Sequence, residues 1–156
     1  MNAVLQSSLD RPCALCGIPL DAQYFDSSRI VSLPGGSEEL RNIVLAEFEL
    51  PPQYCGVLQH FFQFSDLLAA DPARIDTPDL EWTIRVNGHP LHPYLGFRHI
   101  VNPWGSPCCP VAIRLDEGAR LEFTVRHVGR NLSPVHRVGA RLVGRYWYNS
   151  AYGTVA

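Results

Sequence analysis

The feature that most constrains the fold is an alternation of apolar and polar side chains with a period of two. The stretch LEWTIRVNG (80–88) places leucine, tryptophan, isoleucine and valine on one face, and mostly polar side chains on the other. The stretches ARLEFTVRHV (119–128) and VHRVGARLVGRYWY (135–148) repeat the alternation. Because successive side chains of a β-strand point to opposite faces, each stretch predicts a strand with one face toward a core.

Shorter or less regular alternation predicts further strands, over 29–33, 43–50, 57–68 and 111–115. In the 57–68 segment, the side chains expected on the core face are Leu58, His60, Phe62 and Phe64. His60 is accordingly interpreted as a packed histidine rather than a ligand. Short helices are predicted only over 37–42 and 66–70, which favours an all-β chain.

The predicted fold is an antiparallel two-sheet β-sandwich of jelly-roll or Greek-key type, because many strands each have one apolar face to bury. Thirteen prolines and twelve glycines agree with a chain rich in turns. We predict an irregular N-terminal arm over 1–40, the sandwich domain over 41–150 and a C-terminal tail over 151–156.

Composition and charge narrow the classes of function. The chain has 156 residues, of which 46% are hydrophobic and 18% charged, as expected for one globular domain. No apolar run approaches the roughly 20 residues that a membrane-spanning helix needs, so no membrane role is predicted. The N-terminus lacks the pattern of a signal peptide, and folding in a cytoplasm is expected. A net charge of −2 does not favour nucleic acid as a partner.

The segment 89–110 is the main candidate for a chemical site, since it holds three histidines, two adjacent cysteines and five prolines. One hypothesis is a zinc ion bound by Cys13, Cys16, His89 and His92, a tetrahedral Cys₂His₂ set. About 70 residues separate the two pairs, which is unusual for a structural zinc site. A cupin-type metal site would need a His-x-His pair followed by a glutamate, and the segment has neither. The prolines favour a stiff connecting loop without a resident metal or cofactor.

Two further chemistries are candidates for the same segment. Nucleophilic catalysis by Cys108 or Cys109 would need a group that lowers the thiol pKa, and only His99 and His136 are candidates. No catalytic residue is therefore predicted, and the protein is expected not to be an enzyme. Carbohydrate binding would use exposed aromatic side chains as platforms, with candidates at Tyr94, Phe97, Trp104 and Trp147.

An arginine row in the last predicted strand is the candidate interaction site. Arg137, Arg141 and Arg145 recur every fourth residue, so a strand would place all three on one face, about 13 Å apart. Val143 and Trp147 share that face. Arginine and tryptophan are frequent at the energetic centres of protein interfaces. The predicted interface residues are Arg137, Arg141, Arg145, Trp147 and Trp104.

The carboxy-terminal half carries a pattern of spaced leucines, glycines and aromatic residues. It consists of Leu115, Gly118, Leu121, Phe123, Val125 and Gly129, followed by Ala140, Leu142, Gly144 and Trp147. Over 80–148 the chain resembles β-sandwich virion proteins of tailed bacteriophages, such as capsid decoration (cement) proteins and neck, collar or fibre-associated proteins.

The resemblance implies a non-enzymatic structural protein of the virion, without a cofactor, that forms homo-oligomers or contacts other virion proteins such as major capsid, neck or tail proteins. The alternative is a carbohydrate-binding β-sandwich module used for host-surface recognition.

Overall fold

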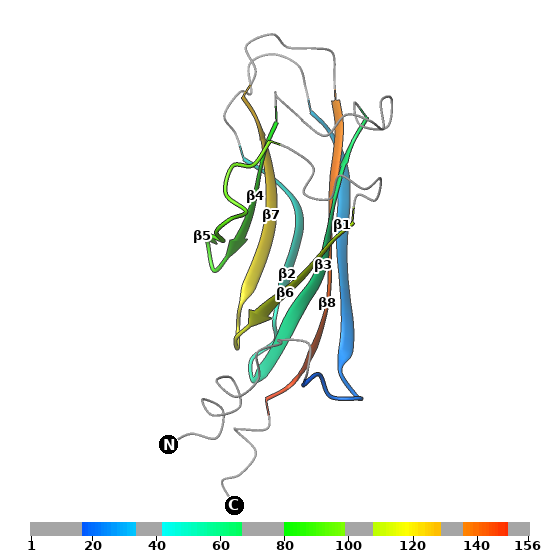
Figure 1. Cartoon of the computed structure of the whole chain (residues 1–156), viewed down its shortest axis with the longest axis vertical. Coiled ribbons are helices and arrows are strands. Elements are labelled where there is room, and N and C mark those ends of the chain that lie inside the picture. The colour runs from blue at the N-terminus through cyan, green and yellow to red at the C-terminus, as the bar shows by residue number, and fades with distance from the viewer. Residues whose placement is uncertain (1–16, 34–41, 67–79, 99–107, 129–135, 150–156) are drawn as a thin grey trace, which may run out of the picture.

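The computed structural model describes residues 17–33, 42–66, 80–98, 108–128 and 136–149. These residues form eight strands: β1 (Gln23–Leu33), β2 (Ile43–Glu49), β3 (Tyr54–Ser65), β4 (Leu80–Val86), β5 (His89–Pro90), β6 (Cys108–Leu115), β7 (Arg120–His127) and β8 (His136–Tyr148). The strands build two four-stranded antiparallel sheets that pack face to face (Figure 1). The predicted all-β, two-sheet sandwich is confirmed.

The strand order identifies the sandwich as a jelly roll. Sheet A has the order β1-β8-β3-β6 and sheet B the order β2-β7-β4-β5. The first strand thus pairs with the eighth, the second with the seventh, the third with the sixth and the fourth with the fifth. This nested pairing arises when one antiparallel ribbon rolls up until β8 also pairs with β3, and β7 with β4.

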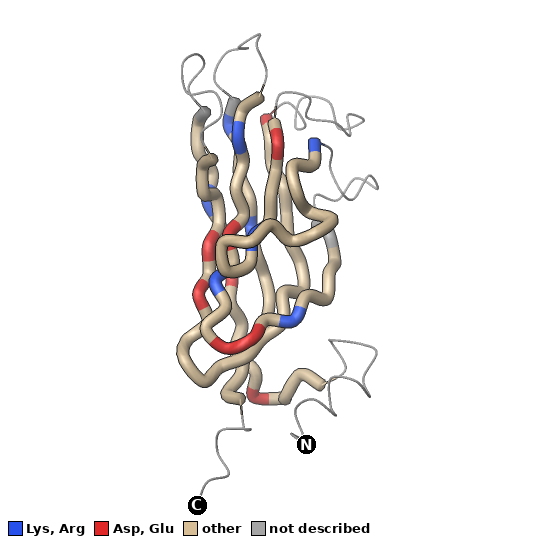
Figure 2. The backbone as a smooth tube through the Cα atoms, turned by 90° about the vertical axis from the view of Figure 1, so that its left-hand side faces the viewer, with Lys and Arg blue, Asp and Glu red and all other residues tan. Residues whose placement is uncertain are grey.

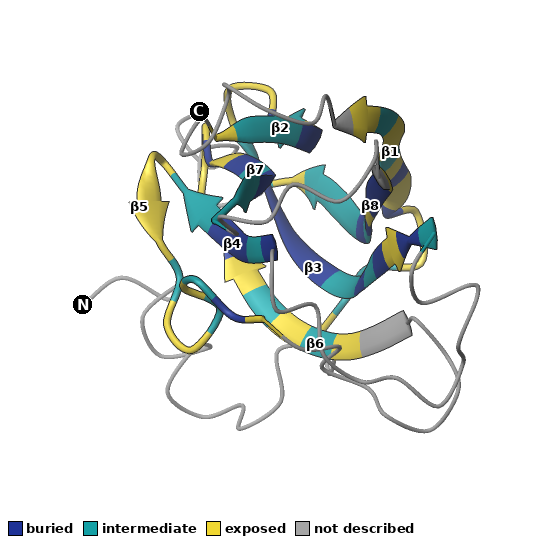
Figure 3. Ribbon diagram, turned by 90° about the horizontal axis from the view of Figure 1, so that it is seen from above, coloured by how far each residue is buried: buried dark blue, intermediate teal, exposed yellow. Residues whose placement is uncertain are grey.

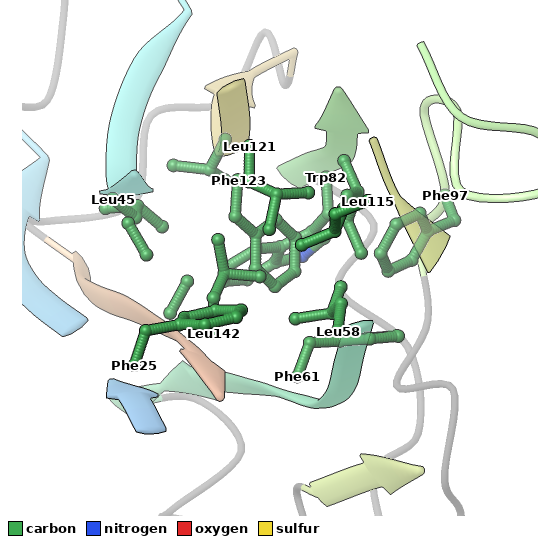
Figure 4. Close-up of a cluster of buried hydrophobic side chains, with 14 of the residues drawn as sticks. Phe25, Leu45, Leu58, Phe61, Trp82, Phe97, Leu115, Leu121, Phe123 and Leu142 are labelled. Atoms are coloured by element: carbon green, nitrogen blue, oxygen red, sulfur yellow. The ribbon is translucent and has the colours of Figure 1, made fainter. Parts of the chain in front are cut away.

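The core lies between the two sheets, where the buried positions of the strands face one another (Figure 3). Its centre is aromatic: the Phe123 ring lies 5.5 Å from the Phe61 ring and 5.9 Å from the Trp82 ring, measured between centroids (Figure 4). All three side chains are fully buried. The predicted core faces of 80–88 and 119–128 are confirmed at Leu80, Trp82, Ile84, Ala119, Leu121, Phe123 and Val125.

A bulge in β3 reverses the predicted facing of its second half. The register of β3 against both neighbours shifts between Leu58 and His60. One extra residue changes the phase of a strand, so side chains after it exchange faces. Leu58 points inward as predicted, but the prediction is wrong for His60, Phe62 and Phe64, which lie on the outer face. The inward positions are instead Phe61, Gln63 and Ser65, all of them buried.

The first strand is longer than predicted and belongs to the sandwich. β1 begins at Gln23 instead of the predicted residue 29 and pairs with β8 over its entire length. Its anchor is Phe25, which is buried and stacks on Phe48 with ring centroids 4.1 Å apart. The described part of the predicted arm therefore contributes a sheet strand. The predicted helices over 37–42 and 66–70 fall almost wholly outside the described residues, and the tail 151–156 falls entirely outside them.

The segment that follows β5 extends sheet B instead of forming a free loop. Phe97 and Trp82 exchange backbone hydrogen bonds of 2.9 and 3.0 Å, and the Ile84 amide donates to the Tyr94 carbonyl at 2.9 Å. The strand predicted over 111–115 begins earlier than predicted, because β6 begins at Cys108 and includes Pro110, which had been assigned to the stiff loop. β6 is an edge strand of sheet A, where a proline is tolerated. No helix in the described ranges is long and apolar enough to cross a bilayer.

Candidate interaction surface

The outer face of sheet A gathers the arginine row with residues from the two strands beside it. The register of β8 against β1 is continuous, so its alternate residues all share one side. Arg141 lies between Ser28 of β1 and Phe62 of β3, and Arg145 lies opposite Tyr24. We call this surface the arginine face: Tyr24, Asp26, Ser28, Ile30, His60, Phe62, Phe64, Arg137, Arg141, Val143, Arg145 and Trp147.

Arg145 is held in place by Tyr24. Its guanidinium carbon lies 4.2 Å from the centroid of the Tyr24 ring, and its Nη2 donates to the Tyr24 hydroxyl. The tyrosine itself is 67% exposed. Within the described residues, Arg145 forms no ion pair. The side chain is thus oriented by a cation–π contact while its charge has no carboxylate partner there.

Arg141 is held by a different pair of contacts. Its Nε donates to Oδ1 of Asp26 at 2.7 Å, and its Nη2 donates to Oδ2 of the same carboxylate. Its guanidinium carbon lies 5.4 Å from the centroid of the Phe62 ring. The hydrogen bonds from Arg141 hold the pKa of Asp26 below its ordinary value, because they stabilise the ionised carboxylate. The planar bidentate geometry fixes the orientation of the guanidinium relative to Asp26.

An apolar strip crosses the same face beside Arg141. Gly139 of β8 pairs with Ile30 on one side and with Phe64 on the other. A Cβ atom at Gly139 would lie 2.8 Å from Cγ1 of Ile30, so the isoleucine leans over the glycine. Ile30 is 55% exposed and Phe64 is 37% exposed. Apolar side chains that are contiguous and exposed on a sheet face are typical of a surface covered by a partner.

The remaining predicted interface residues lie at the margins. Arg137 is exposed near one end of β8, and its backbone amide donates to Oδ2 of Asp66 at 3.0 Å. Trp147 is half-buried at the other end and pairs with Cys55 of β3. Trp104 lies outside the described residues.

Burial raises the pKa of the Cys55 thiol, which makes it a poor nucleophile.

The outer face of sheet B differs because most of its charges pair with one another within the described residues. Glu81 accepts hydrogen bonds from Arg98 at 2.8 Å and from Arg126, and these contacts hold its pKa below the ordinary value. Arg120 bridges Glu47 and Glu122, with its Nη2 3.1 Å from each carboxylate. Figure 2, viewed from the side of sheet B, shows acidic and basic residues intermixed along the backbone.

The segment after β5 covers part of the outer face of sheet B. The Gly96 amide donates to the Thr83 hydroxyl at 3.1 Å, and the Thr124 hydroxyl donates to the Thr83 carbonyl at 3.3 Å. Both threonines are buried on what would otherwise be an outward face. Most charges of sheet B are therefore paired, although Arg85 and Glu49 form no ion pair among the described residues, and fewer apolar strand positions lie open there than on sheet A.

The other candidate sites from the sequence are not brought together in the described part of the chain. His89 and His92 are exposed, and Cys13 and Cys16 lie outside the described residues. No group of three or more potential metal ligands occurs among the residues described. The backbone of Cys108 pairs with Phe62 within sheet A, and His99 lies outside the described residues.

Two of the four proposed sugar platforms are packed inside. Phe97 is only 8% exposed, and the Tyr94 ring meets the Phe61 ring edge-on at 5.2 Å.

The sequence analysis does not identify Tyr24, Asp26 and Ile30 as members of the arginine face. Their alternation in QYFDSSRI (23–30) was the available signal, obscured by the run of small and polar residues.

No protein-family model matches this sequence, and no curated protein matches it.

Proposed function

We propose that the protein is a non-enzymatic structural component of a tailed-bacteriophage particle, an accessory jelly roll that attaches to neighbouring virion proteins through the arginine face. The phage setting comes from the resemblance of the 80–148 segment to decoration and head–tail accessory proteins. The attachment surface comes from the side chains of sheet A. The protein acts by burying this face against its neighbours, and no reaction is involved.

The observation that carries the proposal is the reversed polarity of β3. After the bulge, Phe62 and Phe64 lie outside, while Gln63 and Ser65 lie in the core. Among the described residues, the Gln63 side-chain nitrogen and the Ser65 hydroxyl have no hydrogen-bond partner. A buried polar group without a partner costs about 1–3 kcal/mol, so this phase of β3 costs stability while it places two phenylalanines on the outer face. Local departures from good packing are expected where a surface serves function, here by contacting a partner.

The arginine face suits protein better than sugar. A sugar platform needs an open aromatic ring, but one face of the exposed Tyr24 ring is occupied by the Arg145 guanidinium. Arginines that are already oriented lose little freedom on binding, which favours a stable protein contact. These features support assembly as the role of the face.

The test is whether the chain is part of a purified particle. Particles from the cells that encode this chain are separated on a density gradient, and each fraction is analysed by quantitative mass spectrometry. We expect the chain in the particle fraction at a fixed ratio to the main shell protein, and rebinding of purified chain to stripped particles. A chain found only at the top of the gradient, as a monomer that rebinds to nothing, would contradict the proposal. Binding on a glycan array that is lost in Trp104→Ala would instead indicate the sugar-binding alternative.

A further inference from the structure

Resting on the proposed role in assembly, we infer that the arginine face binds a different protein whose surface presents a carboxylate to Arg145 and apolar side chains to the strip formed by Ile30, Gly139 and Phe64. The partner is thus an acidic protein surface with apolar residues between its acids. Neither a second copy of this chain nor a nucleic acid fits the face as well.

Charge complementarity selects an acidic partner. Three arginines and one aspartate occupy the strand positions of the arginine face, an excess of two positive charges: Arg137, Arg141 and Arg145 against Asp26. Arg141 is engaged by Asp26, whereas Arg145 meets only a tyrosine in the described part of the molecule. A guanidinium has five N–H donors, so Arg145 can receive a carboxylate without leaving Tyr24.

The same charges disfavour a second copy. Two arginine faces packed together would bring six arginines against two aspartates, and like charges across an interface oppose association. A head-to-tail contact with sheet B is also poorly matched, because Glu81 already binds Arg98 and Arg126. The carboxylates of Glu47 and Glu122 share Arg120 in the same way.

The apolar strip disfavours nucleic acid. Ile30 and Val143 are aliphatic and lie among the arginines, where a phosphate backbone would meet them without gaining any contact. Single-stranded nucleic acid binds by stacking its bases on open aromatic rings, and the Tyr24 ring is capped by Arg145. Aliphatic and aromatic side chains of another protein would bury both the strip and its margins.

The size of the face agrees with a protein contact. β1 has 11 residues, and sheet A has four strands. At about 3.3 Å per residue and about 4.8 Å between strands, this rectangle covers roughly 700 Å². A stable interface buries about 800 Å² of each partner, so the outer face of sheet A, of which the arginine face takes three of the four strands, is of the required order.

The experiment uses the immobilised full-length chain and a display library of random twelve-residue peptides. Selections on wild type and on Arg145→Gln are sequenced in parallel. We expect the peptides enriched on wild type, but not on the variant, to carry net negative charge together with at least one large apolar residue. Circular dichroism and thermal melting confirm that both proteins are folded.

The strongest peptide is then titrated by fluorescence anisotropy. We expect Arg145→Gln to weaken binding about tenfold or more, because a desolvated charge pair is lost. Arg145→Lys should be intermediate, since an ammonium keeps the charge but lacks the planar fork. The matched control Arg120→Gln removes an arginine from sheet B and should leave affinity within about twofold.

Several results would overturn the inference. They are an absence of enrichment, enriched peptides that are neutral or basic, or equal enrichment on Arg145→Gln. Tighter, Arg145-dependent binding of a twenty-nucleotide single strand would identify nucleic acid, and an Arg145-dependent dimer in sedimentation equilibrium would identify a second copy. The particle gradient is read separately. If the chain is found in particles but the peptide selection fails, the inference is overturned and the proposed function is not. If acidic peptides bind but the chain is absent from particles, the proposed function is overturned and the inference is not.

Discussion

The register that places the arginine row outside can be tested at Gly144, which points inward between Val143 and Arg145. A Cβ atom at Gly144 would lie 2.2 Å from the Val57 carbonyl oxygen and 2.5 Å from two atoms of the Phe25 ring. Ordinary contacts between such atoms exceed about 3.3 Å. In Gly144→Ala, the backbones of β8 and β3 must separate and the Phe25 ring must move.

The expected cost follows from these overlaps. Overpacking a core costs about 1–3 kcal/mol, and moving Phe25 away from Phe48 forfeits an aromatic stack worth about 0.5–1.5 kcal/mol. We therefore expect Gly144→Ala to lower the free energy of unfolding by about 3 kcal/mol. For a domain of this size, that corresponds to a fall in Tm of about 6–12 °C.

The assay is urea unfolding followed by far-ultraviolet circular dichroism, with Gly118→Ala as the control. Gly118 has a φ of 66°, but no atom lies within 4 Å of a Cβ placed there. Both substitutions change the unfolded chain equally, so their difference compares the overlap in β8 with the strain of a left-handed alanine at position 118. The control should lose only about 1 kcal/mol, the cost of a left-handed alanine. If Gly144→Ala proved no less stable than Gly118→Ala, the register of β8 against β3 would be wrong.

Three further outcomes are expected. Arginines hold the pKa of Asp26 and Glu81 below their ordinary values, so the stability that these carboxylates contribute is present at neutral pH. It should be lost as pH falls below about 4, and urea midpoints from pH 7 to pH 2.5 should fall less steeply in Asp26→Asn and Glu81→Gln. Burial raises the pKa of Cys55, so peptide mapping should find it unlabelled by iodoacetamide at pH 8 until urea unfolds the chain; equal native labelling would contradict its burial. Gln63→Met should raise the free energy of unfolding by about 1 kcal/mol in the same urea assay, because it removes a buried side-chain nitrogen that has no hydrogen-bond partner among the described residues, whereas a loss would show that the amide group is paired.

The sequence predicted the strands whose alternation is uninterrupted. β4 and β7 have a single phase from end to end, so every apolar residue between Leu80 and Ile84, and between Leu121 and Val125, could be assigned to the core. β3 could not be assigned in this way. Its HFFQF run (60–64) offers aromatic residues in both phases, and the bulge before it depends on pairing with β8 and β6, which no local pattern reports.

The candidate site was predictable only in its β8 half. A spacing of four residues in a strand is enough to put Arg137, Arg141 and Arg145 on one face. Their partners Tyr24 and Asp26 lie in β1, and which strand borders β8 is a property of the roll-up rather than of either segment. The sequence also did not predict that β6 includes Pro110. A proline is excluded from a central strand but is tolerated at the edge of a sheet, where β6 lies.

The arginine face also depends on completion of the fold, because its contacts join the first strand to the last. Arg141 and Asp26 are 115 residues apart in the sequence, and Arg145 and Tyr24 are 121 apart. Contacts this distant form only after intervening loops have closed, so a chain lacking either strand cannot display the oriented guanidinium groups. A partner that recognises these groups would bind only chains whose β1 and β8 have paired. Its binding would in turn stabilise that pairing, since a ligand of the native state alone shifts the folding equilibrium toward it.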